Sequence, residues 1–234
     1  MSEHLYSPKA LGQNHTVAVA IGIGGKSVTG DRKQNHAAII YRDDSGSYRL
    51  AHLAWHEIFK HEDWNAQYHW VDLPGIDEGQ LESFADWVVI IASQAAEKPI
   101  PYSVLFTADQ SFDSTGRYSD SRDGHGLTCA TFILAAFSDF GLQIADRNSW
   151  PVDREEDKSW ASKILGRLAK YLAEKYPSMM PHVLAQARQR ELLRRYRPEE
   201  VVACAKYYSG TPVRFVEIKS IAGEIDAQVK REQS

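Results

Sequence analysis

The sequence predicts an α+β fold in which an antiparallel sheet packs on helices. Short β-branched segments gather in the first quarter of the chain, whereas apolar residues recur at three-and-four spacing from residue 77 onward. Strands therefore precede helices instead of alternating with them, as they would in a doubly wound sheet. With 234 residues, 43% of them hydrophobic, the chain can bury a proper core. We expect one domain over residues 1–150 and a helical extension over residues 151–234 packed on it.

The predicted sheet begins with a buried strand over residues 17–23, a short β-branched segment that ends near glycines. Residues 37–41 and 48–54 form two further strands. The turn-forming residues between them, 43–47, make the stretch 37–54 a predicted β-hairpin. The following stretch, 55–75, is rich in Trp, His, Asp and Pro and is expected to be a surface loop.

The first predicted helix covers residues 77–96, whose apolar side chains fall on one stripe, and Pro99 and Pro101 follow its end. Residues 102–106 are expected to form a strand. The polar loop after it, 107–126, has a length typical of functional segments. A second helix is predicted over residues 129–140 and closed by Gly141. Further helices are predicted near 155–175, 179–195 and 198–208. The last predicted helix runs from Thr211-Pro212 to Ile225, and a strand over 213–218 is the alternative to it.

Cys129 is the strongest chemical candidate, because two glycines precede it and an apolar helical pattern begins at it. The N–H groups and partial positive charge of a helix start favour a thiolate over a thiol, and the thiolate is the nucleophile. The alternative is a small buried residue at the edge of the apolar stripe. The other cysteine, Cys204, lies within an apolar stretch of a late helix and is expected to be core.

A cysteine nucleophile needs a base and a third group that orients the base. His36 stands at the start of the second strand and His52 lies in the returning strand, so a hairpin can bring their imidazoles together. We expect His36 to act as base and His52 to hold its tautomer. The alternative is that both are ordinary sheet residues.

The run from His36, HAAIIYRDDSGSYRLAHL, together with residues 127–134, resembles the circularly permuted NlpC/P60 group of papain-like enzymes, which includes lecithin retinol acyltransferase and its relatives. In that group a histidine begins a strand, a second histidine follows the turn, and a later helix carries a cysteine that attacks an acyl or peptide carbonyl. The resemblance implies a papain-like domain over residues 1–150, in which Cys129 is nucleophile, His36 base and His52 orienter. The acyltransferase branch has Asn-Cys-Glu-His-Phe, whereas this chain has Thr-Cys-Ala-Thr-Phe. We therefore expect hydrolysis rather than acyl transfer to lipid.

The oxyanion formed during attack needs hydrogen-bond donors, and the backbone N–H of Cys129 at the helix start is the first of them. Gln110, His125 and Thr128 are the further candidates for oxyanion or substrate contacts. His125, four residues before the cysteine, is the second choice for the base.

Two other motifs suggest different chemistry. Residues 20–27, which include Lys26, resemble a phosphate-binding loop, but a strand rather than a helix is predicted soon afterwards. His56-Glu57 is followed by His61, one residue too late for a zinc motif of the H-E-x-x-H type. We expect His52, His56, His61 and His69 to be scattered, and neither a metal nor a cofactor to be needed.

Composition narrows the class of partner. The net charge of −4 and the pI near 6.1 give no general attraction to nucleic acid, and no apolar run reaches the ~18 residues of a membrane span. Two cysteines and the absence of a signal-peptide pattern favour a cytoplasmic protein. The expected function is thiol hydrolysis of a peptide, amide or (thio)ester bond in a peptide or acyl-bearing substrate. The alternatives are a non-enzymatic binding module on the same scaffold and a nucleotide-binding protein.

Overall fold

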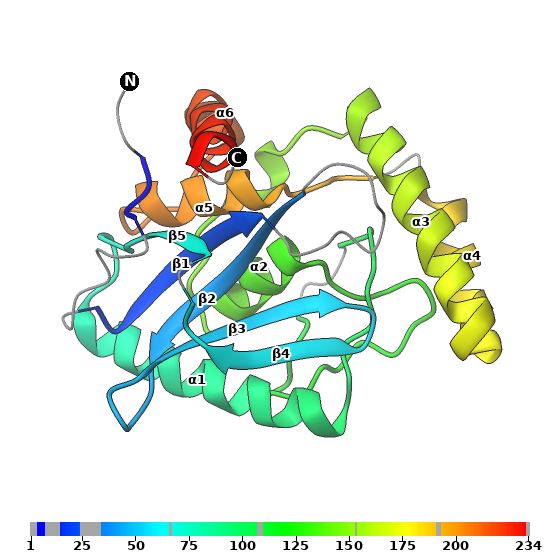
Figure 1. The fold of residues 1–234 in the computed structure, drawn as a ribbon, viewed down its shortest axis with the longest axis horizontal. Coiled ribbons are helices and arrows are strands. Elements are labelled where there is room, and N and C mark those ends of the chain that lie inside the picture. Colours follow the sequence, from blue (N-terminus) through cyan, green and yellow to red (C-terminus); the bar gives the residue numbers. More distant parts are fainter. Residues whose placement is uncertain are drawn as a thin grey trace.

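The computed structural model of the protein describes residues 4–7, 15–23, 34–65, 67–106, 110–152, 154–190 and 193–232. These residues form an α+β architecture, in which helices pack around a five-stranded antiparallel sheet (Figure 1). The α+β class predicted from the order of the elements is confirmed. None of the helices in the described ranges is both long and apolar enough to cross a lipid bilayer.

The sheet has the strand order β4-β3-β2-β1-β5, and every neighbouring pair is antiparallel. Its strands are β1 (Val17–Ile23), β2 (Asn35–Arg42), β3 (Tyr48–Trp55), β4 (Ile58–Asp63) and β5 (Tyr68–Val71). The predicted hairpin is present as β2 and β3, with Ile39 opposite Ala51. At its turn, Gly46 has a φ of +81°, in the region that glycine adopts without strain.

The expectation of a loop over residues 55–75 is wrong, because this stretch contains β4 and β5. Strand β4 lies at the edge of the sheet, and four of its six residues are polar or charged, as is common on edges that avoid pairing with other chains. Strand β5 has only four residues. Neither strand therefore shows the apolar alternation on which a sequence-based assignment depends.

The helices are α1 (Glu78–Glu97), α2 (Cys129–Asp139), α3 (Glu155–Lys175), α4 (Met180–Arg188), α5 (Pro198–Tyr207) and α6 (Phe215–Glu232), with 3-10 turns at η2 (Arg147–Ser149) and η3 (Pro177–Met179). The alternative of a strand over 213–218 is wrong, since α6 begins at Phe215. The strand expected over 102–106 is also not formed, because Tyr102 makes only a single bridge, to Leu127. Helix α4 ends before the predicted boundary at 195, and residues 193–197 are extended.

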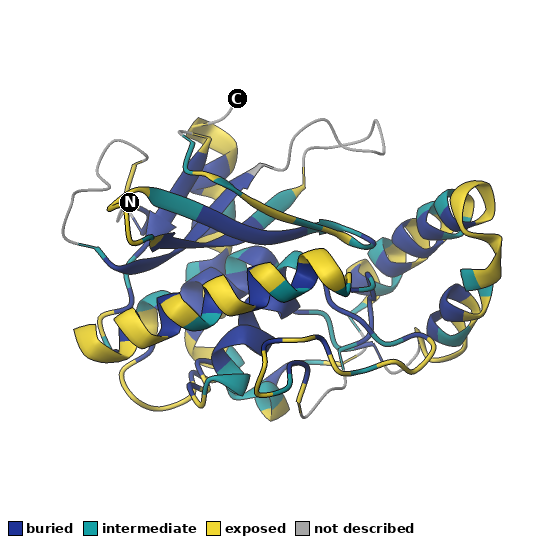
Figure 2. Cartoon of the chain, turned by 90° about the horizontal axis from the view of Figure 1, so that it is seen from below, coloured by how far each residue is buried: buried dark blue, intermediate teal, exposed yellow. Residues whose placement is uncertain are grey.

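One face of the sheet carries the main core. Helices α1, α2 and α5 pack on it, and α6 packs on α5 and β1. Figure 2 shows the consequence for α1, which is buried along its inner side and exposed along its outer side. The opposite face holds a small cluster formed by Ala18, Ala20, Ala38, Ile40, Leu50, Tyr68 and Trp70.

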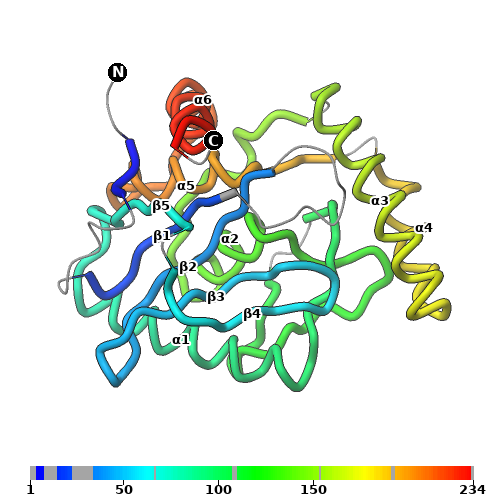
Figure 3. Tube along the Cα trace, viewed as in Figure 1, coloured from blue at the N-terminus to red at the C-terminus, as the bar shows by residue number. Residues whose placement is uncertain are grey.

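Helices α3 and α4 stand together at one end of the molecule, and the chain then returns to α5 (Figure 3). On this return it passes the first residues of β2, where Asn35 Nδ2 donates to Glu199 Oε2 at 2.9 Å. The first turn of α5 is thereby held close to the strand that begins with Asn35 and His36. Buried side chains of α3, α5 and α6 belong to the same hydrophobic cluster as those of the sheet.

Candidate active site

Cys129 is the first residue of α2, as predicted, and the structure of the helix start explains why. Thr128 is the N-cap residue, and its Oγ1 accepts a hydrogen bond from the backbone N–H of Thr131, whose own Oγ1 accepts from the N–H of Thr128. A side chain at Gly126 would lie 2.3 Å from the carbonyl oxygen of Pro101, so only glycine fits there. The cap and the close approach fix where the helix begins, and with it the position of the thiol.

Replacing Thr128 with alanine is expected to lower the free energy of unfolding by about 1 kcal/mol, because the helix loses its N-cap acceptor. Denaturant unfolding followed by circular dichroism measures this change. Thr115→Ala is the matched control, since that hydroxyl belongs to an exposed turn and bonds Asp113. Equal stabilities of the two variants would contradict the capping role.

The sulfur of Cys129 lies against the start of β2. Helix α2 packs on β2, and the backbone N–H groups of Ala37, Cys129 and Ala130 act to lower the pKa of the thiol. Cys129 is partly exposed to solvent, whereas Cys204 is fully buried in α5. Of the two cysteines, Cys129 alone therefore has exposed surface.

His36 and His52 meet on neighbouring strands. His36 Nε2 and His52 Nδ1 are 2.8 Å apart, and His52 Nε2 is 3.3 Å from Glu62 Oε1 on β4. We call the series of His36, His52 and Glu62 the polar relay. Glu62 was not singled out from the sequence, because recognising it requires β4 as a strand paired with β3.

The relay fixes the tautomer of His36. An ionised Glu62 can only accept a hydrogen bond, and the hydrogen bond with His52 lowers its pKa against the raising effect of burial. His52 must then carry its proton on Nε2, which leaves Nδ1 as an acceptor for the Nε2–H of His36. His36 Nδ1 is consequently unprotonated, and it is the nitrogen able to receive a proton.

Both relay histidines are neutral near pH 7. Burial lowers the pKa of His36 to about 4, with the charge of Lys60 acting in the same direction. Burial also lowers the pKa of His52, and the nearby His36 contributes to this shift. Neutral imidazoles are the form that a general base requires.

The protonation of Cys129 differs from the expectation. Burial raises the pKa of the thiol above its ordinary value, and this effect exceeds the lowering by the N–H groups of Ala37 and Ala130 and by the charge of Arg195. The position of Cys129 at the helix start is therefore not sufficient to keep its thiol ionised.

Three further side chains interact electrostatically with the thiol and were not found from the sequence. Burial raises the pKa of Tyr68 and Tyr102, and the negative charge of a Cys129 thiolate raises both further. The positive charge of Arg195 acts in the opposite sense on Tyr102 and on Cys129. Tyr68 was hidden in the stretch expected to be a loop, and Arg195 lies in the stretch expected to be helical.

The remaining predicted contacts lie in other surroundings. Gln110 is exposed, and its amide donates to the carbonyl oxygen of Phe112 at 3.1 Å. His125 Nδ1 is 2.8 Å from Asp120 Oδ2. The Thr128 side chain is engaged in the helix cap. The roles of these three as substrate or oxyanion contacts stay predictions.

The other histidines of residues 52–69 do not converge. His56 packs against His182 with ring centroids 5.4 Å apart, His61 bonds the hydroxyl of Tyr41, and His69 lies 3.5 Å from a carboxylate oxygen of Glu232. The described parts of the chain contain no group of three His, Cys, Asp or Glu side chains suited to a metal ion. Residues 24–27 of the glycine-rich motif, including Lys26, lie outside the described residues.

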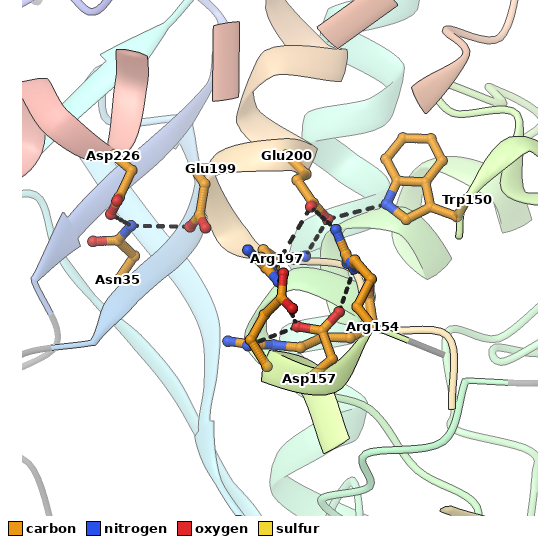
Figure 4. A network of polar contacts seen from close by, with 10 residues as sticks. Asn35, Trp150, Arg154, Asp157, Arg197, Glu199, Glu200 and Asp226 are labelled. Atoms are coloured by element: carbon orange, nitrogen blue, oxygen red, sulfur yellow. Dashed lines mark hydrogen bonds and ion pairs between the residues drawn. The ribbon is translucent and has the colours of Figure 1, made fainter. Parts of the chain in front are cut away.

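Next to the site lies a buried ionic network (Figure 4). Asp157 is 2% exposed and accepts hydrogen bonds from Arg154, Arg195 and Arg197, while Glu200 is 4% exposed and accepts from Arg154 and from the indole N–H of Trp150. Because both carboxylates are buried and fully paired, the network holds α3 against the start of α5. It thereby fixes the segment that carries Arg195.

Comparisons with protein-family models, with curated protein sequences and with solved structures gave no match to this chain. The functional argument therefore rests on the geometry and electrostatics of the site.

Proposed function

We propose that the protein is a thiol hydrolase with a papain-like domain, in the circularly permuted NlpC/P60 arrangement, that cleaves a peptide, amide or (thio)ester bond through a covalent acyl-enzyme. One observation carries the proposal. Cys129 begins a helix that packs on β2, and β2 carries His36, which is hydrogen-bonded through His52 to Glu62. These are the residue types that covalent thiol catalysis uses as nucleophile, base and orienting groups.

In the proposed reaction His36 Nδ1 receives the thiol proton while Sγ forms a bond to the substrate carbonyl carbon. Proton transfer accompanies attack because the imidazole is weakly basic and the pKa of the thiol is raised by burial. The backbone N–H of Cys129 at the helix start is the donor that we propose for the oxyanion.

The tetrahedral species then collapses, and His36 returns its proton to the leaving amine, alcohol or thiol. Water attacks the resulting thioester after giving a proton to the same nitrogen, and the carboxylic acid leaves with the thiol restored. His52 and Glu62 keep the His36 ring in one tautomer throughout. Each group of the polar relay has a role in this cycle without any metal.

Acyl-reactive probes, such as acyloxymethyl ketones and activated thioesters, test the proposal. The wild-type protein is expected to acquire one adduct, which mass spectrometry assigns to Cys129. Cys129→Ala should remove the adduct, whereas Cys204→Ala should retain it if the variant folds, since that thiol is fully buried and burial raises its pKa. A folded wild-type protein that forms no adduct with any probe would contradict the proposal.

The raised pKa of the Cys129 thiol favours a second candidate, a non-enzymatic binding module that retains the scaffold. Such a module would bind peptides without forming an adduct. Titration of a peptide library against the wild-type protein and Cys129→Ala separates the two functions, because only the hydrolase loses turnover while keeping affinity.

A further inference from the structure

Arg195 has hydrogen-bonding capacity that the protein does not use. Its Nη1 donates to Asp157 Oδ1 at 3.1 Å, and its guanidinium carbon lies 3.9 Å from the ring centroid of Trp160. Within the described parts of the chain, Nε and Nη2 make no hydrogen bond, and 18% of the side chain is exposed. These two nitrogens form one edge of the guanidinium, the edge that binds a carboxylate through two parallel hydrogen bonds.

Trp160 also has a hydrogen-bond donor that the protein does not use. Its indole Nε1 is buried without a hydrogen-bond partner, although buried donors are normally satisfied. An unpaired indole donor beneath a guanidinium with a free edge indicates that this place is suited to a ligand rich in acceptor oxygens.

The charges around Arg195 point the same way. Three guanidinium groups, those of Arg154, Arg195 and Arg197, surround two buried carboxylates, Asp157 and Glu200. Glu156, whose carboxylate also pairs with Arg197, is exposed. Glu199 is also near, and burial raises its pKa. Among the described residues, Arg195 pairs only with Asp157, and through Nη1 alone.

Arg195 lies on the chain that leads into α5, three residues before that helix begins. The hydrogen bond between Asn35 and Glu199 ties the first turn of α5 to the start of β2, and α2, whose first residue is Cys129, packs on both β2 and α5. In keeping with this placement, the charge of Arg195 acts to lower the pKa of the Cys129 thiol.

We infer that Arg195, stacked on Trp160, forms an anion subsite beside Cys129, which receives a carboxylate carried by the acyl portion of the substrate. The inference deepens the proposed function and rests on it, because the subsite selects which acyl group reaches the thiol. The substrate class is then an acidic acyl group, such as a peptide with a carboxylate close to the scissile carbonyl.

Alkylation by a matched pair of reagents tests the subsite without requiring turnover. Iodoacetate and iodoacetamide differ only in the carboxylate, and both alkylate the Cys129 sulfur with release of iodide. We expect the ratio of the two rate constants to exceed that of N-acetylcysteine by about tenfold or more, as a charge-assisted hydrogen bond allows. Arg195→Gln should return the ratio to the free-thiol value, and Arg195→Lys should retain part of the preference.

Arg195→Gln also changes the pKa of Cys129, but that change alters the rates with both reagents equally. The ratio of the two rate constants is therefore independent of it. Arg117→Gln removes the same charge from an exposed loop residue that pairs with Glu97, and should leave the ratio unchanged. If Arg195→Gln does not fold, protection of wild-type Cys129 from iodoacetamide by succinate, but not by succinamide, provides the same test.

The outcomes separate the two ideas. A reactive Cys129 with no preference for iodoacetate, and no protection by succinate, would overturn the subsite and leave the hydrolase proposal standing. A Cys129 as slow as Cys204 towards both reagents would overturn both. Hydrolysis of a succinyl ester in preference to a butyryl ester, lost in Arg195→Gln through a higher KM, would support both.

Discussion

The His36→Gln variant is expected to retain the fold and to lose about a thousandfold in kcat/KM towards an activated acyl substrate. A positioned general base contributes about 10² to 10⁴ in rate, and glutamine cannot receive the thiol proton. The loss should appear mainly in kcat, because the imidazole acts on the proton in transit rather than on substrate affinity. Steady-state kinetics with a chromogenic thioester measures it.

Glu62→Gln is the informative companion. Glutamine can donate to His52 as well as accept from it, so the relay no longer dictates which nitrogen of His36 is protonated. We expect a loss of about tenfold, smaller than that of His36→Gln. Unchanged activity in Glu62→Gln would refute the tautomer argument, and unchanged activity in His36→Gln would transfer the role of base to another residue, with His125 the next to be tested.

Acid is expected to destabilise the protein between pH 6.5 and pH 4. His56 has no exposed surface, and burial lowers its pKa from 6.5 to about 4, with the nearby His182 adding to the effect. The unfolded chain therefore binds a proton in this interval that the folded protein does not, and stability falls as the pH falls. His52 and His36 act in the same direction.

A shift of this size at His56 corresponds to about 3 kcal/mol, fully present above pH 6.5 and lost by about pH 4. Denaturant unfolding at several pH values measures the slope. His56→Asn serves as the control, because the amide oxygen can replace Nδ1 as the acceptor for the N–H of Tyr102 but does not titrate. The variant should show a flatter profile, and an identical profile in both proteins would contradict the assignment to His56.

The sequence predicted the parts of the fold that are governed by local signals. The turn at 43–47 marked the hairpin of β2 and β3, and antiparallel pairing then brings His36 and His52 together. The glycines and the apolar stripe placed Cys129 in the first turn of a helix, and it is the first residue of α2. In each case neighbours in the sequence determine the structure.

What sequence analysis missed depends on distant parts of the chain. Glu62 belongs to an edge strand without apolar alternation, and Arg195 lies on the chain return that the hydrogen bond between Asn35 and Glu199 joins to β2. The raised pKa of the Cys129 thiol likewise depends on burial, which a helix-start pattern does not contain. Tertiary packing decides all three.

Hydrogen bonding between Asn35 and Glu199 has a wider consequence, because it joins the late part of the chain to the start of β2. In the proposed enzyme the reacting groups all belong to the sheet and α2, whereas the anion subsite belongs to the later part of the chain. Selection of the acyl group should accordingly require both halves to have docked, whereas reactivity of the thiol should not.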